Sequence, residues 1–249
     1  MSIIEDGARN IMFTTKRISP LSAAIVVLAV MTLLLAGASA ARNRVWQDAT
    51  SLWLDVAVKS PAKRFPEHVA FIYYGLGEEY LTRGELDNAV VMYRKAIYLK
   101  PGYAKAHEGL GTVYREKGDM ESAIAEYREA ISLDPSYITA YHSLGKAYQN
   151  KGQFDRAIEQ FSLALTVDPA NSETYRRRGV AYGEKGDSDR ALRDLSRAIE
   201  ISPDPADAYY DRGVLYARTD RREHALRDFE RSCARGSTLG CEGVKRLKD

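Results

Sequence analysis

Few side chains in this sequence have the types and spacing that catalysis or metal binding requires. The two cysteines, Cys233 and Cys241, both lie near the C-terminus, and no Cys/His cluster has the spacing of a metal site. The histidines are scattered along the chain: His68, His107, His142 and His224. The glycines recur at regular positions and form no phosphate-binding loop, and neighbouring acids such as Glu78 and Glu79 are expected on a solvated helix face. We therefore expect a protein that is not an enzyme and that holds no metal or cofactor.

The charge balance points away from nucleic acid. The 249 residues include 36 Lys and Arg against 34 Asp and Glu, which gives a net charge of +2. A dedicated nucleic-acid protein carries a basic surface that this balance does not favour.

One pattern of residue types recurs every 34 residues through most of the chain. Its first copy is Tyr73, Leu76, Gly77, Tyr80, Gly84, Ala89, Tyr93, Ala96 and Pro101, and its second is His107, Leu110, Gly111, Tyr114, Gly118, Ala123, Tyr127, Ala130 and Pro135. Two further copies follow, and a fifth is degenerate. A fixed period of this length indicates a solenoid of stacked units.

Each unit contains two amphipathic stretches with apolar residues three and four apart, which predicts two helices. In the second unit these are 104–116 and 120–133. Gly118 between them is expected to end the first helix, and Pro135 to stop the second. The periodicity makes the many tyrosines core residues rather than a platform for stacking bases.

The recurring residues resemble the tetratricopeptide repeat (TPR) over about residues 68–235. The resemblance implies an all-α fold, a right-handed solenoid of helix–turn–helix repeats, in which Gly111 faces Ala123. The expected units are 70–103, 104–137, 138–171, 172–205 and a degenerate 206–235, followed by a C-terminal cap at 236–249.

A stretch without any charge precedes the repeats, at 18–41. It is long enough to cross a bilayer core as a helix. We expect a transmembrane anchor after a cytoplasmic leader at 1–17. The alternative is a signal peptide with Lys16 and Arg17 as its positive region, cleaved near Ala40. Both place the repeats on the exported side of a bacterial-type inner membrane, in the periplasm.

Residues 42–69 are expected to form a capping half-repeat and a linker. The segment RNRVWQDATSLWLDVAVKSP at 42–61 has the spacing of a second helix. After an apolar span it also resembles the C-terminal part of multispanning transmembrane-and-TPR proteins with a glycosyltransferase-like membrane domain. This chain has no such catalytic domain, so the resemblance bears on topology alone.

The last segment leaves the repeat pattern. Cys233 is expected at the end of the last second helix, and Gly236 to Gly240 can reverse the chain so that Cys241 opens a short closing helix. That arrangement brings the two cysteines within reach of a disulfide, which an exported compartment would preserve. The alternative is two unpaired cysteines packed as small apolar residues.

TPR arrays bind peptides or helices along the concave face that the first helix of each unit lines. The resemblance assigns to this face Phe71, Tyr74, Glu78, Lys105, Glu108, Thr112, Arg115, Thr139, His142, Lys146, Gln149, Asn150, Glu173, Arg176, Val180, Asp207, Tyr210 and Val214. The residues are polar and of both signs, and Tyr74 and Glu78 depart from the Lys and Asn of the chaperone carboxylate clamp.

We therefore expect a membrane-anchored scaffold that binds a protein or peptide partner in this groove, with no nucleic acid and no metal. The alternative is an accessory subunit or fragment of a membrane glycosyltransferase system.

Overall fold

The structure is a computed structural model that describes residues 66–202 and 204–248. The chain divides into two compact units, 1–55 and 56–249, and all described residues belong to the second. The predicted leader at 1–17, the predicted anchor at 18–41 and most of the capping half-repeat and linker predicted at 42–69 lie outside the described residues; residues 66–69 of that last range are helical. Within the described part, no helix is both long and apolar enough to traverse a bilayer.

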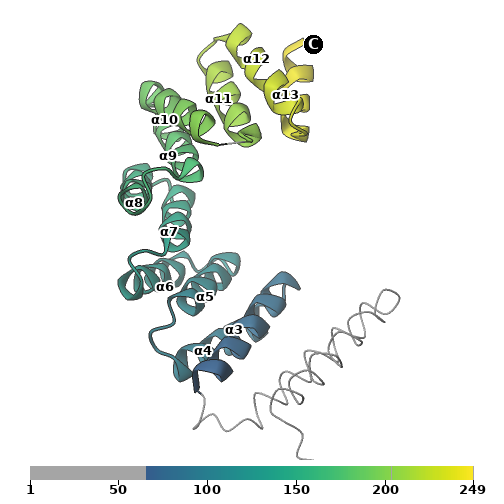
Figure 1. The fold of residues 1–249 in the computed structure, drawn as a ribbon. Helices are drawn as coiled ribbons and strands as arrows, with labels where there is room; N and C mark the ends of the chain where they lie inside the picture. The colour runs from purple at the N-terminus through teal and green to yellow at the C-terminus, as the bar shows by residue number, and fades with distance from the viewer. Residues whose placement is uncertain (1–65, 203, 249) are drawn as a thin grey trace, which may run out of the picture. The chain divides into compact units, whose positions relative to one another are not determined.

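Residues 66–202 and 204–248 contain eleven helices and no strand (Figure 1). Five helix pairs are followed by one closing helix. The pairs are α3 (Pro66–Thr82) with α4 (Leu86–Leu99), α5 (Ala104–Glu116) with α6 (Met120–Leu133), α7 (Ile138–Asn150) with α8 (Phe154–Val167), α9 (Ser172–Lys185) with α10 (Ser188–Ile201), and α11 (Ala206–Arg218) with α12 (Arg222–Cys233); the closing helix is α13 (Thr238–Lys248).

The helices predicted at 104–116 and 120–133 are confirmed as α5 and α6. Helix α3 begins at Pro66, before the expected start of the first unit at residue 70, because proline suits the first turn of a helix. The closing helix also begins earlier than expected, at Thr238 rather than Cys241.

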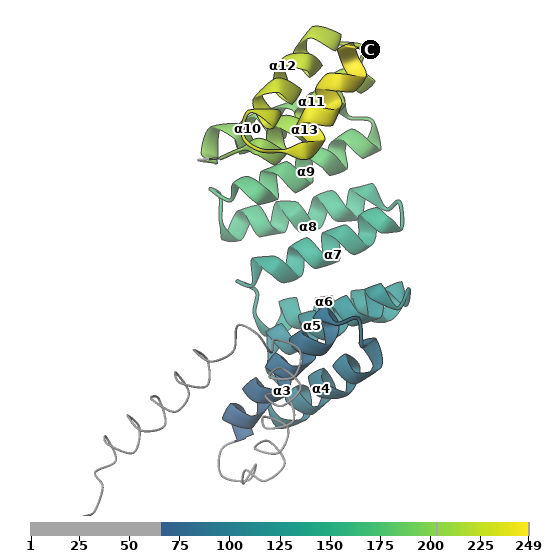
Figure 2. The same cartoon turned by 90° about the vertical axis from the view of Figure 1, so that its right-hand side faces the viewer.

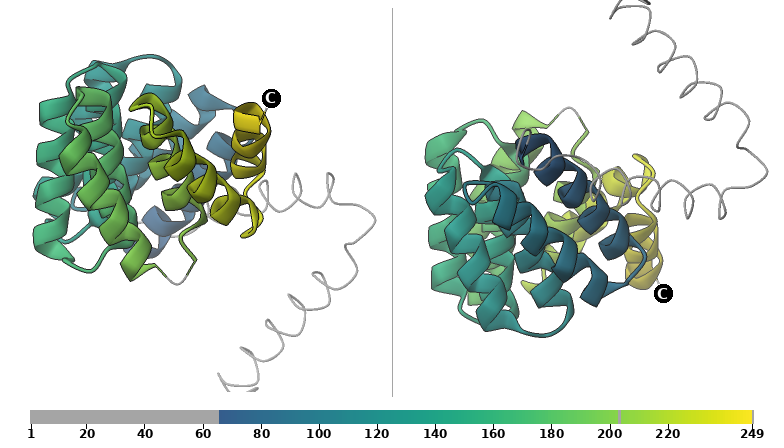
Figure 3. Two further views of the ribbon diagram at one scale, coloured as in Figure 1. Left: turned by 90° about the horizontal axis from the view of Figure 1, so that it is seen from above. Right: turned by 90° about the horizontal axis from the view of Figure 1, so that it is seen from below.

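The pairs stack in chain order from α3 to α13 (Figure 2). The first helices of successive pairs contact one another, from α3 and α5 through to α11 and α13. The second helices α4, α6, α8, α10 and α12 make no such contacts with one another. Figure 3 looks along this stack from its two ends. The first helices therefore lie closer together than the second helices do. The array curves toward the first helices, which line its concave side.

A glycine on each first helix lets the second helix approach closely. A Cβ on Gly111 would lie 2.7 Å from Cε1 of Tyr127 and 3.1 Å from the carbonyl oxygen of Ala123. The expected contact with Ala123 therefore exists, but the side chain that needs the space is the fully buried ring of Tyr127. Gly77 with Tyr93 and Gly145 with Phe161 repeat the arrangement.

The turns between paired helices need a left-handed residue. In the first four pairs a glycine has this left-handed conformation: φ is 74° at Gly84, 82° at Gly118, 69° at Gly152 and 92° at Gly186. The last pair has Asp220 at this place, with φ 59°. The Cβ of an L-residue makes that conformation costly, so the fifth turn is locally strained.

Two buried ion pairs replace apolar contacts in the last two pairs. Arg178 Nε and Nη2 donate to the Asp194 carboxylate at 2.7 and 3.0 Å, while Nη1 donates to Ser162 Oγ at 3.2 Å. Arg212 makes the same contacts with Asp228, at 2.7 and 3.0 Å, and with Ser196 at 2.9 Å. The first three pairs have buried leucines at this position: Leu76, Leu110 and Leu144.

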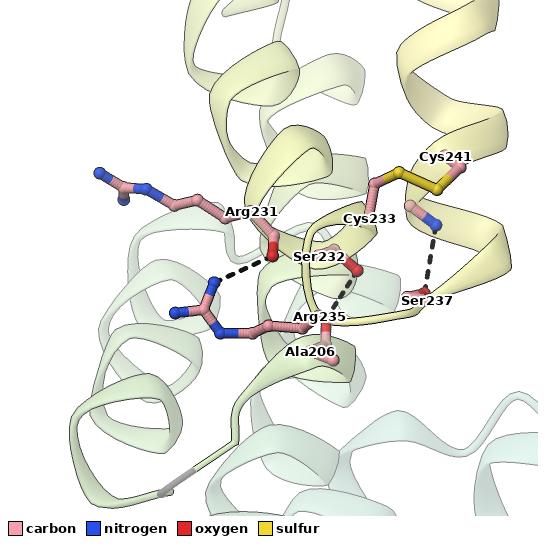
Figure 4. Close-up of a disulfide and its surroundings, with 8 residues drawn as sticks. Ala206, Arg231, Ser232, Cys233, Arg235, Ser237 and Cys241 are labelled. Carbon is pink, nitrogen blue, oxygen red and sulfur yellow. Dashed lines mark hydrogen bonds between the residues drawn. A yellow bond between two sulfur atoms is a disulfide. The ribbon is translucent and has the colours of Figure 1, made fainter.

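The closing helix α13 is joined to α12 by a disulfide between Cys233 and Cys241, whose Cα atoms lie 4.6 Å apart (Figure 4). Gly236, with φ 85°, reverses the chain between them. Gly240 lies against Ser232, and Gly243 lies against the ring of Phe229. Within the C-terminal cap expected at 236–249, residues 238–248 thus form a helix that packs against α12.

Candidate partner-binding groove

All predicted groove residues lie on the first helices, α3, α5, α7, α9 and α11. The exposed members are Phe71, Glu78, Lys105, Thr139, Lys146, Asn150 and Asp207. The partly buried members are Tyr74, Glu108, Thr112, Arg115, His142, Gln149, Glu173, Arg176, Val180, Tyr210 and Val214. The partly buried ones gather in three successive groups along the concave face.

The first group, on α3 and α5, joins two carboxylates to tyrosine rings. Glu78 accepts a hydrogen bond from the hydroxyl of Tyr93. The ring of Tyr74 lies 5.3 Å from that of Tyr103 and 6.0 Å from that of Tyr93, centroid to centroid. Burial and then the negative charge of Glu78 raise the pKa of both Tyr74 and Tyr103. These hydroxyls therefore stay protonated beside the carboxylates.

Glu108 is held by neighbouring hydroxyls. Ser143 Oγ donates to its Oε1 at 2.6 Å, and Thr112 Oγ1 donates to the same atom at 3.3 Å. Burial raises the pKa of Glu108, while the two hydrogen bonds lower it. Burial, followed by the charge of Glu108, raises the pKa of Tyr137 to about 12. This part of the face is acidic and polar, with Arg115 as the cation that acts on Glu108.

The second group, on α7, α9 and α11, is an ionic cluster around Arg176. Its Nε and Nη2 donate to the Glu173 carboxylate at 2.7 and 2.8 Å, and its Nη1 donates to Asp211 at 2.6 Å. His142 Nε2 lies 2.6 Å from Thr174 Oγ1. Burial, and then the positive charge of Arg177, lowers the pKa of His142 to about 4. This histidine is therefore neutral at physiological pH.

The third group borders two adjoining hollows. The smaller, of about 240 Å³, is lined by Gly179, Val180, Gly183, Glu184, Leu195, Tyr210, Asp211, Val214, Leu215 and Arg218. The larger, of about 400 Å³, is lined by Tyr210, Val214, Ala217, Arg218, Phe229, Leu239, Glu242, Gly243, Arg246 and Leu247. Tyr210, Val214 and Arg218 line both, so the two hollows lie next to each other, and we refer to them together as the depression over α9, α11 and α13.

Sequence reasoning missed one register position of the concave face. The residues Ser143, Arg177 and Asp211 each bond to a predicted groove residue, yet none was assigned to the face. The signal was present, because the first two units have Gly75 and Gly109 at this position and the later three have polar side chains. The wall from α13 was also missed, since this helix lies outside the repeat period.

Nothing in the part of the chain that the structure describes gathers three or more His, Cys, Asp or Glu side chains in a metal-binding arrangement. The concave face combines charged and hydroxyl groups with an apolar depression, which suits recognition of a polypeptide segment.

Comparison with known families agrees with the periodicity. A TPR repeat family model matches residues 77–118, 111–152 and 182–220, and a tetratricopeptide repeat model matches 138–171. The chain contains tetratricopeptide repeats. Proteins built of TPR repeats are in general non-catalytic scaffolds.

Solved TPR structures share the fold. A crystal structure of MamA is 25% identical with a TM-score of 0.56, covering 64% of this chain and 94% of its own. YrrB, described as a TPR protein with an unusual peptide-binding site, is 24% identical with a TM-score of 0.56, over 76% of this chain and 97% of its own. PilF of Pseudomonas aeruginosa is 20% identical with a TM-score of 0.64, over 74% and 86%. No curated protein matches the sequence.

Proposed function

We propose that this protein is a membrane-anchored, non-catalytic TPR scaffold that binds a segment of a partner protein along its concave face. The observation that carries the proposal is the composition of that face. Exposed Lys105 and Lys146, the carboxylates of Glu78 and Glu108, and the depression over α9, α11 and α13 offer charge and apolar surface together. YrrB, with its peptide-binding site, gives a precedent within the same fold.

The anchor in this proposal is the uncharged stretch at 18–41, and the TPR array faces the exported compartment. Length and the absence of charge support a membrane span. The disulfide between Cys233 and Cys241 supports an oxidising compartment, since cytosolic thiols are kept reduced.

Partner binding is tested by crosslinking in membranes of the native host, followed by affinity capture of the full chain and mass spectrometry. Lys105→Glu with Lys146→Glu should remove the specific partners, because both lysines are exposed on first helices. The control is Arg193→Glu with Arg227→Glu, which makes the same change in charge at exposed positions on the second helices α10 and α12. Equal capture by the two variants would reject the concave face as the binding surface.

Topology is tested with reporters. An alkaline phosphatase fused after Asp249 should be active, and a reporter that works only in the cytoplasm should be silent there. Protein from the exported fraction, alkylated without reductant, should show no free thiol at Cys233 or Cys241. An active cytoplasmic reporter would reject the exported location.

A further inference from the structure

The larger hollow has a composition that the other parts of the concave face lack. We call it the α11–α13 pocket, with Tyr210, Val214, Ala217, Leu239, Gly243 and Leu247 as its lining side and Phe229 as its floor. The ring of Phe229 lies 5.7 Å from that of Tyr210, centroid to centroid, and only 5% of Phe229 is exposed. Leu239, by contrast, is 51% exposed, so an apolar wall stands open to solvent.

The repeat register shows that one position of the concave face is apolar only in the last two units. At the position of Val180 and Val214, the first three units have polar residues: Glu78, Thr112 and Lys146. Three residues further along the helix, Gly183 and Ala217 replace the larger Leu81, Arg115 and Gln149. Small side chains beside valines leave the face hollow at α9 and α11, where larger side chains occupy the position of Gly183 and Ala217 in the first three units.

The far wall of the pocket is a helix that is not part of any repeat. Leu239, Gly243 and Leu247 come from α13, which the Cys233–Cys241 disulfide joins to α12 (Figure 4). Gly243 lies so close to Phe229 that a Cβ there would be 2.7 Å from Cγ of the ring. This close approach fixes α13 against the floor of the pocket and leaves its leucines facing the opening.

The charge at the pocket edge is positive. The lining of this pocket includes two arginines, Arg218 and Arg246, and one carboxylate, that of Glu242. Arg246 lies 3.7 Å from Glu242, whereas Arg218 makes no ion pair with any residue that the structure describes. An unpaired guanidinium beside an apolar hollow favours a ligand that brings a carboxylate next to an apolar side chain.

We propose that the α11–α13 pocket binds a partner segment with a bulky apolar side chain in the hollow and an adjacent Asp or Glu that pairs with Arg218. This inference rests on the proposed function, since it names the partner's chemistry at one end of the same groove. It also makes α13 part of the binding surface, and the disulfide that joins this helix to α12 then supports the pocket wall as well as closing the solenoid.

The test uses the full chain in lipid nanodiscs and a phage-displayed library of random dodecapeptides as the probe. Enriched peptides should share a Leu, Ile, Phe or Trp with an acidic residue close by. The affinity of the best synthetic peptide is then measured by fluorescence anisotropy. Ala217→Phe, which fills the pocket from an exposed position, should weaken binding at least tenfold.

The matched control is Ala125→Phe, the same change at an exposed alanine on α6, and it should alter binding less than twofold. Arg218→Glu should weaken the same peptide, and replacing the acidic residue of the peptide by lysine should restore binding to Arg218→Glu alone. That exchange of charges separates a direct pairing from a general loss of structure.

The outcomes separate this inference from the proposed function. Peptides that bind Ala217→Phe as well as the wild type, but are lost with Lys105→Glu and Lys146→Glu, would overturn the pocket and leave the groove. Peptides lost in Ala217→Phe that ignore the exchange of charges would overturn the role of Arg218. A library that yields no specific peptide would overturn both the pocket and the groove.

Discussion

Removing Asp228 tests whether the last TPR unit depends on a buried ion pair. Only 2% of Asp228 is exposed, and both of its carboxylate oxygens accept hydrogen bonds from Arg212, at 2.7 and 3.0 Å. In Asp228→Ala the guanidinium keeps one hydrogen bond, to Ser196, and lies 5.7 Å from the ring centroid of Tyr209. It remains a largely buried charge without its counterion.

Breaking a buried pair by removing one partner costs about 3–5 kcal/mol. The desolvation penalty of the remaining charge accounts for much of this, because the pair's attraction no longer offsets it. At about 1.4 kcal/mol for each factor of ten, the opening equilibrium of the last unit should rise by about a hundredfold to several thousandfold. Since units of a solenoid interact with their neighbours only, the loss should be local.

Hydrogen–deuterium exchange with mass spectrometry measures this directly. Amides of α11, α12 and α13 should exchange faster in Asp228→Ala, while those of α5 and α6 keep their wild-type rates. A single melting temperature would average over units that open separately.

The matched variant restores the residues of the first unit, where Leu76 and Met92 occupy these two positions and both are buried. Arg212→Leu with Asp228→Met should be at least as stable as the wild type within about 1 kcal/mol, since apolar replacements of buried pairs are often neutral or stabilising. The reasoning is refuted if Asp228→Ala costs less than about 1 kcal/mol, or if the double replacement is as damaging as the single one.

Three further predictions follow, one each from the packing, the turns and the groove. Gly111→Ala should lower the free energy of unfolding, measured in urea, by about 1–3 kcal/mol, because its Cβ would lie 2.7 Å from a buried ring. The control Gly75→Ala, whose Cβ would have nothing within 4 Å, should instead raise it by up to about 1 kcal/mol. Equal effects of the two substitutions would contradict the close contact at Gly111. Asp220→Gly should stabilise the pair α11 and α12 by about 0.5–1 kcal/mol, and Gly118→Asp should destabilise the pair α5 and α6, since both turns require a positive φ. Hydrogen exchange of the amides in each pair measures both effects. The pKa of His142 is about 4 in the folded chain and near 6.5 unfolded, so its contribution to stability is complete above pH 6.5 and is lost as the pH falls toward 4. The urea midpoints at pH 7 and pH 5 should therefore differ less for His142→Gln than for the wild type. An unchanged difference would show that the lowered pKa of His142 does not account for the pH dependence.

The helices were predictable because each carries its own period and its own stop signal. The apolar spacing of 104–116 and 120–133 and the glycine between them need no knowledge of the rest of the fold. The pairing of Arg178 with Asp194 was not predicted, since it depends on which side chains two helices bring together. The sequence does contain a sign of this pairing. The two units with arginine in place of leucine, at Arg178 and Arg212, are also the two units with aspartate 16 residues later.

The groove was predictable only as a set of positions. The repeat indicates which residues face inward, and the structure shows that several of them bond to neighbouring side chains. Tyr74 packs against two other rings and Arg176 holds two carboxylates, so these side chains shape the surface as well as line it. The pocket wall from α13 had no periodic signal, because a single closing helix repeats nothing.

The unequal contacts between first and second helices have a mechanical consequence. No Cα atoms of successive outer helices, such as α4, α6 and α8, come within 8 Å of one another, whereas those of successive inner helices do. A change in curvature can therefore alter the spacing of the outer helices without breaking packing between them. We therefore expect the array to bend more easily along its outer side than along its inner side, so that tension on a bound partner would change its curvature before any unit unfolds.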